Sequence, residues 1–260
     1  MLKGIYTIAS SLMAQEVASD VMANNVANMN TNAFKRSMVS FQTFPDLMIQ
    51  RVSGSAESGK QNSQNIGSIA TGSKIYTTQF DFSQGDLYTT GNAFHIAIQG
   101  DAFFNVRDPN TDEITFTRNG SLDRDSEGYL ATLSGQRLQG EQGDIAVPPG
   151  AFIEFMPNGV VRMNGEQVDT LVLTAFENNK TLEMKGDSLF AKTASTVEKK
   201  IDPLNRGYKV QQGTLEHANV NPIKELMNTM VALRSYESMQ KNIQAHNETL
   251  GQAINQMARP

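Results

Sequence analysis

Residues 222–257 read PIKELMNTMVALRSYESMQKNIQAHNETLGQAINQM, and this stretch decides how the C-terminal end folds. Large apolar side chains recur along it, mostly at steps of three and four residues, which is the spacing of an α-helical stripe. The stripe consists of Ile223, Leu226, Met230, Leu233, Tyr236, Met239, Ile243, Leu250 and Met257. Asn221 suits the N-cap, and Pro222 suits the first helical position, where a missing N–H costs nothing. A long helix beginning at Pro222 is therefore predicted.

A second helical pattern lies at the other end of the chain. Its apolar stripe consists of Ile5, Ile8, Leu12, Met22, Val26 and Met29. The asparagines between Asn24 and Asn32 predict where this helix ends, because asparagine has modest helix propensity and tolerates the left-handed conformation that terminates helices. Both stripes are narrow and lie far along the chain from other helical pattern. They therefore need a partner, which is either the other stripe or the same segments of further copies.

The C-terminal stripe is not a strict heptad, because Leu233, Tyr236 and Met239 come at successive steps of three. Packing among many helices is therefore favoured over a two-stranded coiled coil. Methionines in the stripe add flexible packing surface that tolerates different neighbours. The alternative is that the stripe packs against the central part of the same chain. Packing against further copies predicts a self-assembling structural subunit rather than an enzyme.

The central part of the chain carries the patterns of a β domain. From Lys74 to about Gln212, short segments of alternating polarity are separated by turn signals. The dipeptides Asn119-Gly120, Asn158-Gly159 and Asn164-Gly165 predict hairpins, because both residue types accept the positive φ of type I′ turns. Between residues 52 and 72 the chain is rich in Ser, Gly, Asn and Gln, which predicts a flexible loop. The fold class predicted for the whole chain is α+β.

The composition excludes several classes of function. The chain has 260 residues, 39% of them hydrophobic, so it can build a sizeable core. A net charge of −5 without a Lys/Arg cluster argues against a nucleic-acid partner. The absence of cysteine excludes disulfides and suits a protein that crosses a membrane unfolded. The N-terminus lacks the pattern of a signal peptide, and no stretch has the ~20 apolar residues that span a bilayer. A secreted fate would need a route that leaves the N-terminus uncut.

Few residues suggest chemistry. Asp123, Asp125, Glu127 and Gly128 resemble the first half of a calcium loop, but Ser134 stands where the bidentate glutamate belongs. A polar hairpin turn is therefore predicted there. The three histidines are widely spaced, which gives a metal site no local support. Without a phosphate loop or nucleophile elbow, we expect no catalytic residues, no cofactor, no metal and no small-molecule substrate.

Residues 23–35 read ANNVANMNTNAFK, which closely resembles the N-terminal signature of bacterial flagellar rod and hook proteins. The matching positions are Ala23, Asn24, Asn25, Ala27, Asn28, Thr31, Phe34 and Lys35. Segments 83–106, 116–140 and 213–243 resemble the same family, so the resemblance spans nearly the whole chain. The chain length and the lack of a large central insertion resemble the short basal-body rod proteins of the FlgF and FlgG type.

The resemblance implies that different segments of the chain have different structural roles. Residues 1–34 and 214–260 would form a terminal helical assembly domain, 35–73 a connecting segment with a flexible loop at 52–72, and 74–213 a β-rich outer domain. Subunits of this family stack helically into a drive shaft that encloses the export channel and transmits torque from motor to hook. The implied partners are other copies, other rod and hook subunits and the type III export apparatus. The implied location is the flagellar basal body, at the level of the periplasm or cell wall, after export without cleavage.

Some points stay open at this level. The family usually has glycine where Ala33 stands and an acidic residue where His95 stands, which leaves the turn after the first helix and one polar contact undecided. Asn24, Asn25 and Asn28 either face water at the helix end or bond to neighbouring subunits, and the dense match to the signature favours the second alternative. A rival function is a soluble adaptor or export chaperone that uses its terminal helices as a binding hairpin.

Overall fold

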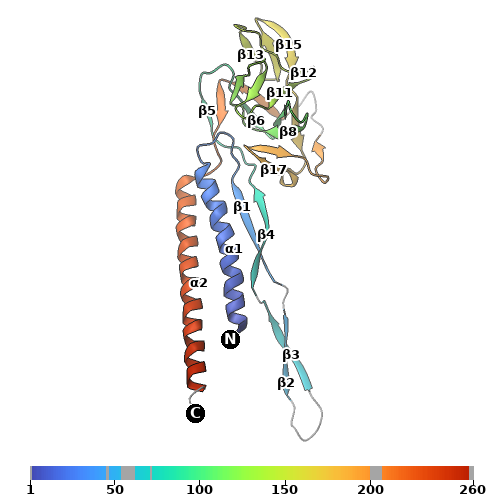
Figure 1. Cartoon of the computed structure of the whole chain (residues 1–260). Helices are drawn as coiled ribbons and strands as arrows, with labels where there is room; N and C mark the ends of the chain where they lie inside the picture. Colours follow the sequence, from blue (N-terminus) through green and yellow to red (C-terminus); the bar gives the residue numbers. More distant parts are fainter. Residues whose placement is uncertain (1, 45–46, 54–61, 71, 200–206, 258–260) are drawn as a thin grey trace. The chain divides into compact units, whose positions relative to one another are not determined.

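The computed structural model describes residues 2–44, 47–53, 62–70, 72–199 and 207–257. Contacts divide the chain into two compact units. The helical unit contains residues 1–26, 37–79 and 222–260, and the β unit contains residues 27–36 and 80–221. A helix at each end and a strand-rich middle confirm the predicted α+β class (Figure 1). Residues 27–34 and 214–221 group with the β unit, whereas the division made from the sequence joins them to the helices.

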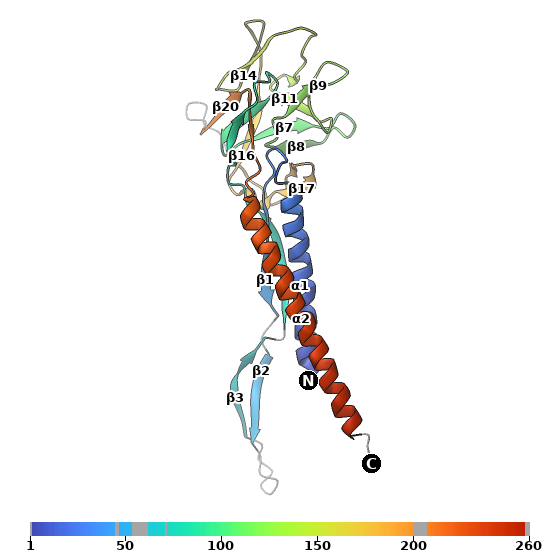
Figure 2. The same cartoon turned by 90° about the vertical axis from the view of Figure 1, so that its left-hand side faces the viewer.

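The helical unit is built on α1, Leu2–Ala27, and α2, Pro222–Met257, which lie side by side and run in opposite directions (Figures 1 and 2). The predicted start at Pro222 is confirmed, and α1 ends inside the asparagine run. Two contacts fix their alignment: Asn25 bonds to Glu225, and a Cβ on Gly4 would lie 3.9 Å from His246 Nε2. Among the described residues, neither helix combines the length and apolarity needed to cross a bilayer.

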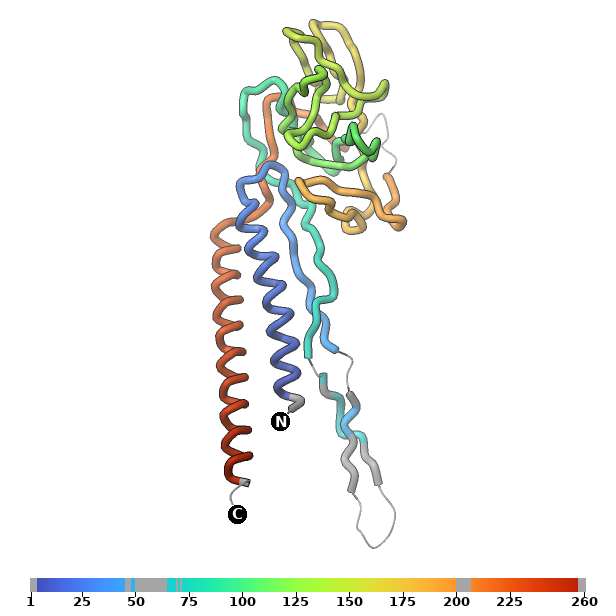
Figure 3. The backbone as a smooth tube through the Cα atoms, viewed as in Figure 1, coloured from blue at the N-terminus to red at the C-terminus, as the bar shows by residue number. Residues whose placement is uncertain are grey.

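Strands complete the helical unit. β1, Ser37–Thr43, pairs with β4, Ser73–Phe80, and the Ser11 hydroxyl on α1 lies 3.3 Å from the Ser73 hydroxyl on β4. The tube in Figure 3 shows β1 and β4 side by side. β2, Leu47–Ser53, and β3, Asn62–Ile69, form an antiparallel pair (Figure 1). The loop predicted at 52–72 is therefore a strand over Asn62–Ile69, because backbone pairing with β2 compensates for a composition poor in apolar residues. Residues 54–61 and 71 of that prediction lie outside the described residues.

The β unit is made of short strands. They are β5 (Leu87–Thr89), β6 (Ile96–Gly100), β7 (Phe103–Arg107), β8 (Ile114–Thr117), β9 (Leu122–Arg124), β10 (Leu130–Thr132), β11 (Arg137–Gly140), β12 (Gly143–Asp144), β13 (Ile153–Phe155), β14 (Val160–Met163), β15 (Glu166–Thr170), β16 (Leu173–Phe176), β17 (Glu183–Gly186), β18 (Leu189–Ala191), β19 (Glu198–Lys199), β20 (Tyr208–Gln212) and β21 (Thr214–Glu216), with the 3-10 helix η1 (Asn179–Thr181). The largest sheet has the order β17-β18-β8-β7-β11-β10-β9, with β12, β16 and β19 at its sides. A second sheet has the order β13-β14-β15, and β20 pairs with β6 as β21 pairs with β5.

Two of the three predicted hairpins are confirmed. Asn158-Gly159 joins β13 to β14, and Asn164-Gly165 joins β14 to β15 with φ values of 51° and 90°. The hairpin predicted at Asn119-Gly120 is wrong, because this dipeptide joins β8 to β9, which pair with other strands. Glycine is required at position 120 because the backbone of Ile96 lies against it: a Cβ on Gly120 would be 1.7 Å from the carbonyl oxygen of Ile96.

The β unit has its own hydrophobic core. Its larger cluster is built from fully buried aliphatic side chains such as Ile96, Leu130 and Leu138. A second cluster is mainly aromatic, and its rings meet edge to face, as at Phe116 and Phe176 with centroids 5.0 Å apart. Each such aromatic pair contributes about 0.5–1.5 kcal/mol beyond its buried area. The β unit therefore contains the apolar burial that a folded domain needs.

Candidate assembly surface and buried polar clusters

The predicted stripe of α2 does not lie on one face of the helix. Tyr236, Met239, Ile243 and Leu250 are half-buried, and Ala232 beside them is buried, as expected for a face turned toward α1. The earlier members are exposed: Ile223 by 73%, Leu226 by 50%, Met230 by 53% and Leu233 by 50%. Each step of three residues falls about 60° short of a full turn, so a stripe built on such steps winds around the helix. The sequence contained this signal in the steps from Leu233 to Met239.

The exposed part of the stripe belongs to a larger apolar surface, which we call the outer ridge. It consists of Ile223, Leu226, Met227, Met230, Val231 and Leu233, each at least 50% exposed, and Leu233 at its edge also borders the groove toward α1. Exposed apolar side chains gathered on one part of a helix are typical of interaction sites. The first helix adds Tyr6, Met13 and Val17, exposed by 73%, 70% and 42%. Sequence reasoning missed these three, although their spacing of seven and four residues places them on one face.

The predicted stripe of α1 is more sheltered. Ile5, Ile8, Leu12, Met22 and Val26 are all half-buried. The most buried positions of α1 are instead small or polar, with Ala14 and Ala18 at most 5% exposed. Small side chains let neighbouring backbones approach closely, so α1 packs through alanine positions that an apolar-stripe search passes over.

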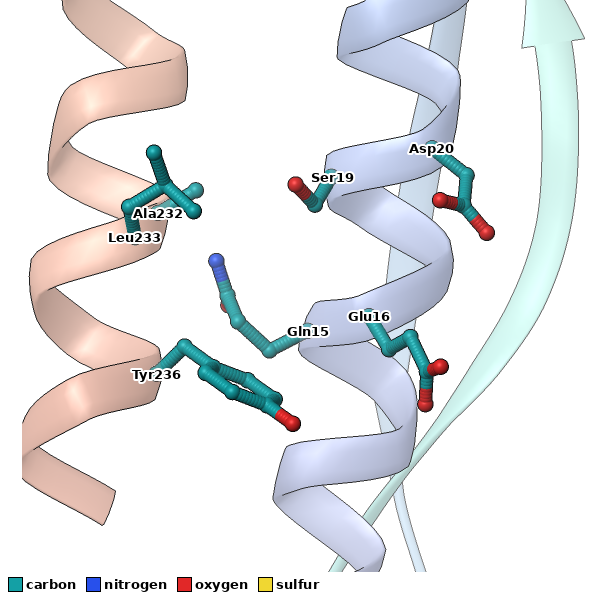
Figure 4. A pocket seen from close by; sticks show the side chains of 7 residues that line it. All are labelled: Gln15, Glu16, Ser19, Asp20, Ala232, Leu233 and Tyr236. Atoms are coloured by element: carbon teal, nitrogen blue, oxygen red, sulfur yellow. The ribbon is translucent and has the colours of Figure 1, made fainter. Parts of the chain in front are cut away.

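A groove between the helices shows how their facing sides meet. It is lined by Gln15, Glu16, Ser19, Asp20, Ala232, Leu233 and Tyr236. Gln15 and Ser19 point toward α2, and the ring of Tyr236 extends toward α1 (Figure 4). The carboxylates of Glu16 and Asp20 point away from α2 (Figure 4). The two carboxylates therefore do not converge with the Tyr236 ring.

Asn25 of the signature is fully buried in the helical unit. Its Nδ2 donates to the carbonyl oxygen of Ser37 at 2.8 Å and to Glu225 Oε1 at 2.9 Å. Its Oδ1 accepts from the backbone N–H of Ser37 at 2.9 Å. One side chain thus joins α1, β1 and α2. Both N–H groups of the Asn25 amide are therefore used within the chain. The bonds to neighbouring subunits expected of Asn24, Asn25 and Asn28 stay a prediction.

The other signature positions lie at the end of α1 and in the segment after it. Ala23, Asn24 and Ala27 are exposed on the last turns of the helix. Asn28 begins the turn that follows: its carbonyl oxygen accepts from the Thr31 backbone N–H at 3.0 Å, and its Oδ1 accepts from the Thr31 hydroxyl at 3.2 Å. These contacts make the first half of the signature a helix-ending structure.

Lys35, the last residue of the signature, forms a buried ion pair in the β unit. Its Nζ lies 2.6 Å from Glu216 Oε1 and donates to the carbonyl oxygen of Ser83 at 2.8 Å. Glu216 Oε1 also accepts from the Gly85 backbone N–H at 2.9 Å. Burial lowers the pKa of the Lys35 ammonium, and the Glu216 carboxylate opposes this shift. The pair ties the segment after α1 to the segment before α2.

Arg118 completes this cluster as a second buried cation. Its Nη2 donates to the carbonyl oxygen of Gly100 at 2.6 Å, and its guanidinium lies 5.0 Å from the ring centroid of Phe103. Its Nη1 is 3.9 Å from Glu216 Oε2. Burial lowers the pKa of Arg118 as well. Glu216 is therefore the buried counter-ion for two cations.

The turn after α1, which the sequence left undecided at Ala33, has a left-handed backbone at that residue. Ala33 has φ of 56°, is 1% exposed and donates its N–H to the Glu216 carbonyl oxygen at 2.8 Å. A left-handed alanine costs roughly 1–2 kcal/mol, so the surrounding contacts hold this conformation. Phe34 beside it is also buried. His95 makes polar contacts of its own, with Thr90 Oγ1 2.9 Å from its Nδ1 and Asn92 Nδ2 3.2 Å from its Nε2.

The acidic stretch that resembles half a calcium loop forms the turn between β9 and β10. Asp125 Oδ1 accepts from the backbone N–H groups of Glu127 and Tyr129, and Arg137 Nε lies 3.1 Å from its Oδ2. Burial opposes ionisation of Asp125, but the N–H of Tyr129 and the Arg137 guanidinium outweigh it and lower the pKa. The predicted polar hairpin turn is confirmed. The described residues contain no cluster of three or more metal-ligating side chains.

Two antiparallel terminal helices and a β unit with its own core define the chain as an α+β protein. Three family models match it. Residues 5–35 match the flagella basal body rod protein model, residues 97–163 the flagellar hook protein FlgE/F/G D1 domain, and residues 211–257 the flagellar basal body rod FlgEFG protein C-terminal model. The chain belongs to the flagellar basal-body rod and hook protein family.

Individual relatives agree over the full length. The chain is 32% identical over 262 residues to the flagellar basal-body rod protein FlgG of Buchnera aphidicola subsp. Schizaphis graminum, covering 96% of this chain and 98% of that protein. It is 30% identical to the FlgG protein of Borreliella burgdorferi, with 98% of each chain covered. It is 26% identical to the flagellar hook-basal body complex protein FlhO of Bacillus subtilis, with 100% of each covered.

Proposed function

We propose that this chain is a structural subunit of the flagellar basal-body rod and assembles through its terminal helices with copies of itself and with other rod and hook subunits. The observation that carries the proposal is the outer ridge on α2. Its side chains are about half exposed, so covering all of them contributes on the order of 5–9 kcal/mol per copy before entropy is subtracted. Family membership supports the same function.

The assembled rod acts as a drive shaft that encloses the export channel and transmits torque from motor to hook. Its stiffness comes from dense packing of apolar helix faces, because close-packed interiors resist deformation. The subunit reaches the basal body outside the cytoplasm through the type III export apparatus, without cleavage of its N-terminus. It performs no catalysis, as the structural role of the related rod proteins supports.

Deletion of the gene tests the function directly. Electron microscopy of basal bodies purified from a strain that lacks this chain should show a truncated or missing rod, and the cells should not swim. Expression of the wild-type chain should restore both. A strain without the chain that still builds intact, rotating flagella would refute the proposal.

A matched pair of surface variants tests the helical route of assembly. Val231→Ser removes an apolar side chain of the outer ridge that is 67% exposed, whereas Val197→Ser removes one on the β unit that is 57% exposed. Neither change removes buried core, so both chains should fold. We expect Val231→Ser to lower the number of rods per cell and the fraction of swimming cells, and Val197→Ser to leave both unchanged. Equal effects would argue against assembly through the ridge.

A further inference from the structure

The outward faces of the two helices carry matching patterns in opposite order. On α1, Tyr6, Met13 and Val17 are exposed and follow one another at steps of seven and four residues. On α2, Ile223, Met227 and Arg234 are exposed and follow one another at steps of four and seven. Such steps keep three side chains on one face of a helix.

Neither face is used by the contact between α1 and α2 in the same chain. That contact involves Gln15 and Ser19 on α1 and Ala232 and Tyr236 on α2 (Figure 4). Met227 and Ala232 are five residues apart, which places them about 140° apart around the helix. The two patterned faces therefore lie on the outer sides of the helix pair, where another copy can reach them.

We propose, on the basis of the proposed rod function, that α1 of one copy packs antiparallel against α2 of the next copy in a single register. Val17 meets Ile223, Met13 meets Met227 and Tyr6 meets Arg234. Because the spacings mirror each other, the antiparallel alignment makes all three pairs at once, and a parallel alignment cannot.

The chemistry of the three pairs is complementary. Val17 with Ile223 and Met13 with Met227 bury apolar surface, and thioethers adapt to their neighbours. The guanidinium of Arg234 placed over the Tyr6 ring is a cation–π contact. The salt bridges among the described residues do not include Arg234. Beside Val17 and Ile223, the same register brings the acidic Glu16 to the level of the basic Lys224.

The register also implies an axial offset between copies. Within the chain Asn25 lies opposite Glu225, which places Met13 at the level of Glu237. Met227 is ten residues before Glu237, and at 1.5 Å per residue the next copy is displaced by about 15 Å along the helices. The contact joins different surfaces of the two copies and is displaced along the axis. Repetition of such a contact produces an open helical filament rather than a closed ring.

Disulfide cross-linking tests the register, and the chain is suited to it because it contains no cysteine. Cells should express Met13→Cys/Met227→Cys as their sole copy of the chain. Isolated basal bodies are then treated with copper phenanthroline and oxygen, which take two electrons and two protons from each pair of thiols. The controls are the single variants and Met13→Cys/Glu237→Cys, which would cross-link if neighbouring copies lay at the same level.

We expect a ladder of covalent multimers from Met13→Cys/Met227→Cys, at a yield at least tenfold above every control. Val17→Cys/Ile223→Cys provides a second pair in the same register and should give the same ladder. Cross-links in a single variant would reveal contact between like helices and overturn the proposal. Cross-links to position 237, or rods that contain the pairs without any cross-link, would overturn it as well. The rod function itself fails only if deletion of the chain leaves the rod intact.

Discussion

Removal of the negative charge of Glu216 should destabilise the β unit more than removal of either cation it serves. The Lys35 side chain is 0% exposed and that of Glu216 1% exposed, so neither charge is compensated by solvent. Glu216→Gln preserves the side-chain volume and retains an oxygen that accepts from the Gly85 N–H. It leaves the Lys35 ammonium buried without its carboxylate, and it leaves Arg118 with the exposed Asp101 alone, 3.8 Å away. Loss of one partner of a buried ion pair costs about 3–5 kcal/mol, and we expect a loss of this size in the free energy of unfolding.

Lys35→Met should cost less. Glu216 then keeps the Gly85 N–H as a donor and Arg118 as a counter-ion 3.9 Å away. The Ser83 carbonyl oxygen loses the Lys35 ammonium but keeps the Asn219 amide as a donor, 3.1 Å away. Loss of a hydrogen bond to a charged group costs about 1.5–3 kcal/mol. The double variant Lys35→Met/Glu216→Gln removes one cation together with the carboxylate. It should therefore be more stable than Glu216→Gln alone.

Urea unfolding followed by far-ultraviolet circular dichroism gives the free energies, and hydrogen exchange of the β6 and β20 amides assigns the transition to the β unit. High pH supplies an independent check. Burial lowers the pKa of Lys35, so the folded state releases this proton at a lower pH than the unfolded state does. Stability of Glu216→Gln should therefore recover as the pH rises toward the ordinary lysine pKa. A loss below about 1 kcal/mol for Glu216→Gln, or strict additivity in the double variant, would refute this account.

Three further outcomes are expected. Asn25→Ala should lower the stability of the helical unit by about 2–3 kcal/mol in urea unfolding, because Glu225 and the Ser37 backbone lose buried partners. Asn24→Ala, at an exposed position, should cost less. Gly120→Ala should abolish folding of the β unit, judged by loss of amide protection, since its Cβ would overlap a carbonyl oxygen, while Gly251→Ala on α2 meets no atom within 4 Å and should be tolerated. Arg107 and Gln139 outweigh the effect of burial and lower the pKa of Asp144. The Asp144 carboxylate therefore stabilises the fold at pH values above the ordinary aspartate pKa. This stabilisation is lost as the pH falls through the lowered pKa of Asp144. In Asp144→Asn, the melting temperature should therefore fall less than in the wild type when the pH is lowered.

Local chemistry made part of the fold predictable. Pro222 begins α2 because its missing N–H is harmless there, and the asparagine run ends α1. Asn164-Gly165 forms its hairpin because both residues take positive φ. In each case the physical cause lies within a few residues of sequence. The same dipeptide chemistry failed at Asn119-Gly120, where the glycine is required by a distant backbone.

Long-range contacts decided what the sequence could not reveal. The partners of Asn25 and Lys35 lie 200 and 181 residues away, so their roles as buried links were out of reach. The exposed part of the α2 stripe was hidden for another reason: periodicity marks apolar positions but does not say which neighbour covers them. The strand over Asn62–Ile69 depends on its ladder with β2, and its composition gives little sign of it. The division into assembly and outer domains stays a prediction.

Lys35 cannot form its ion pair until Glu216, 181 residues further along the chain, has been synthesised. β6 finds its partner in β20, and β5 in β21, both near the end of the chain. A nascent chain emerges N-terminus first, so the β unit stays unclosed until almost the whole polypeptide has been made. Because the β unit closes late, the growing chain stays unfolded for longer, which gives time to any factor that acts on the unfolded chain.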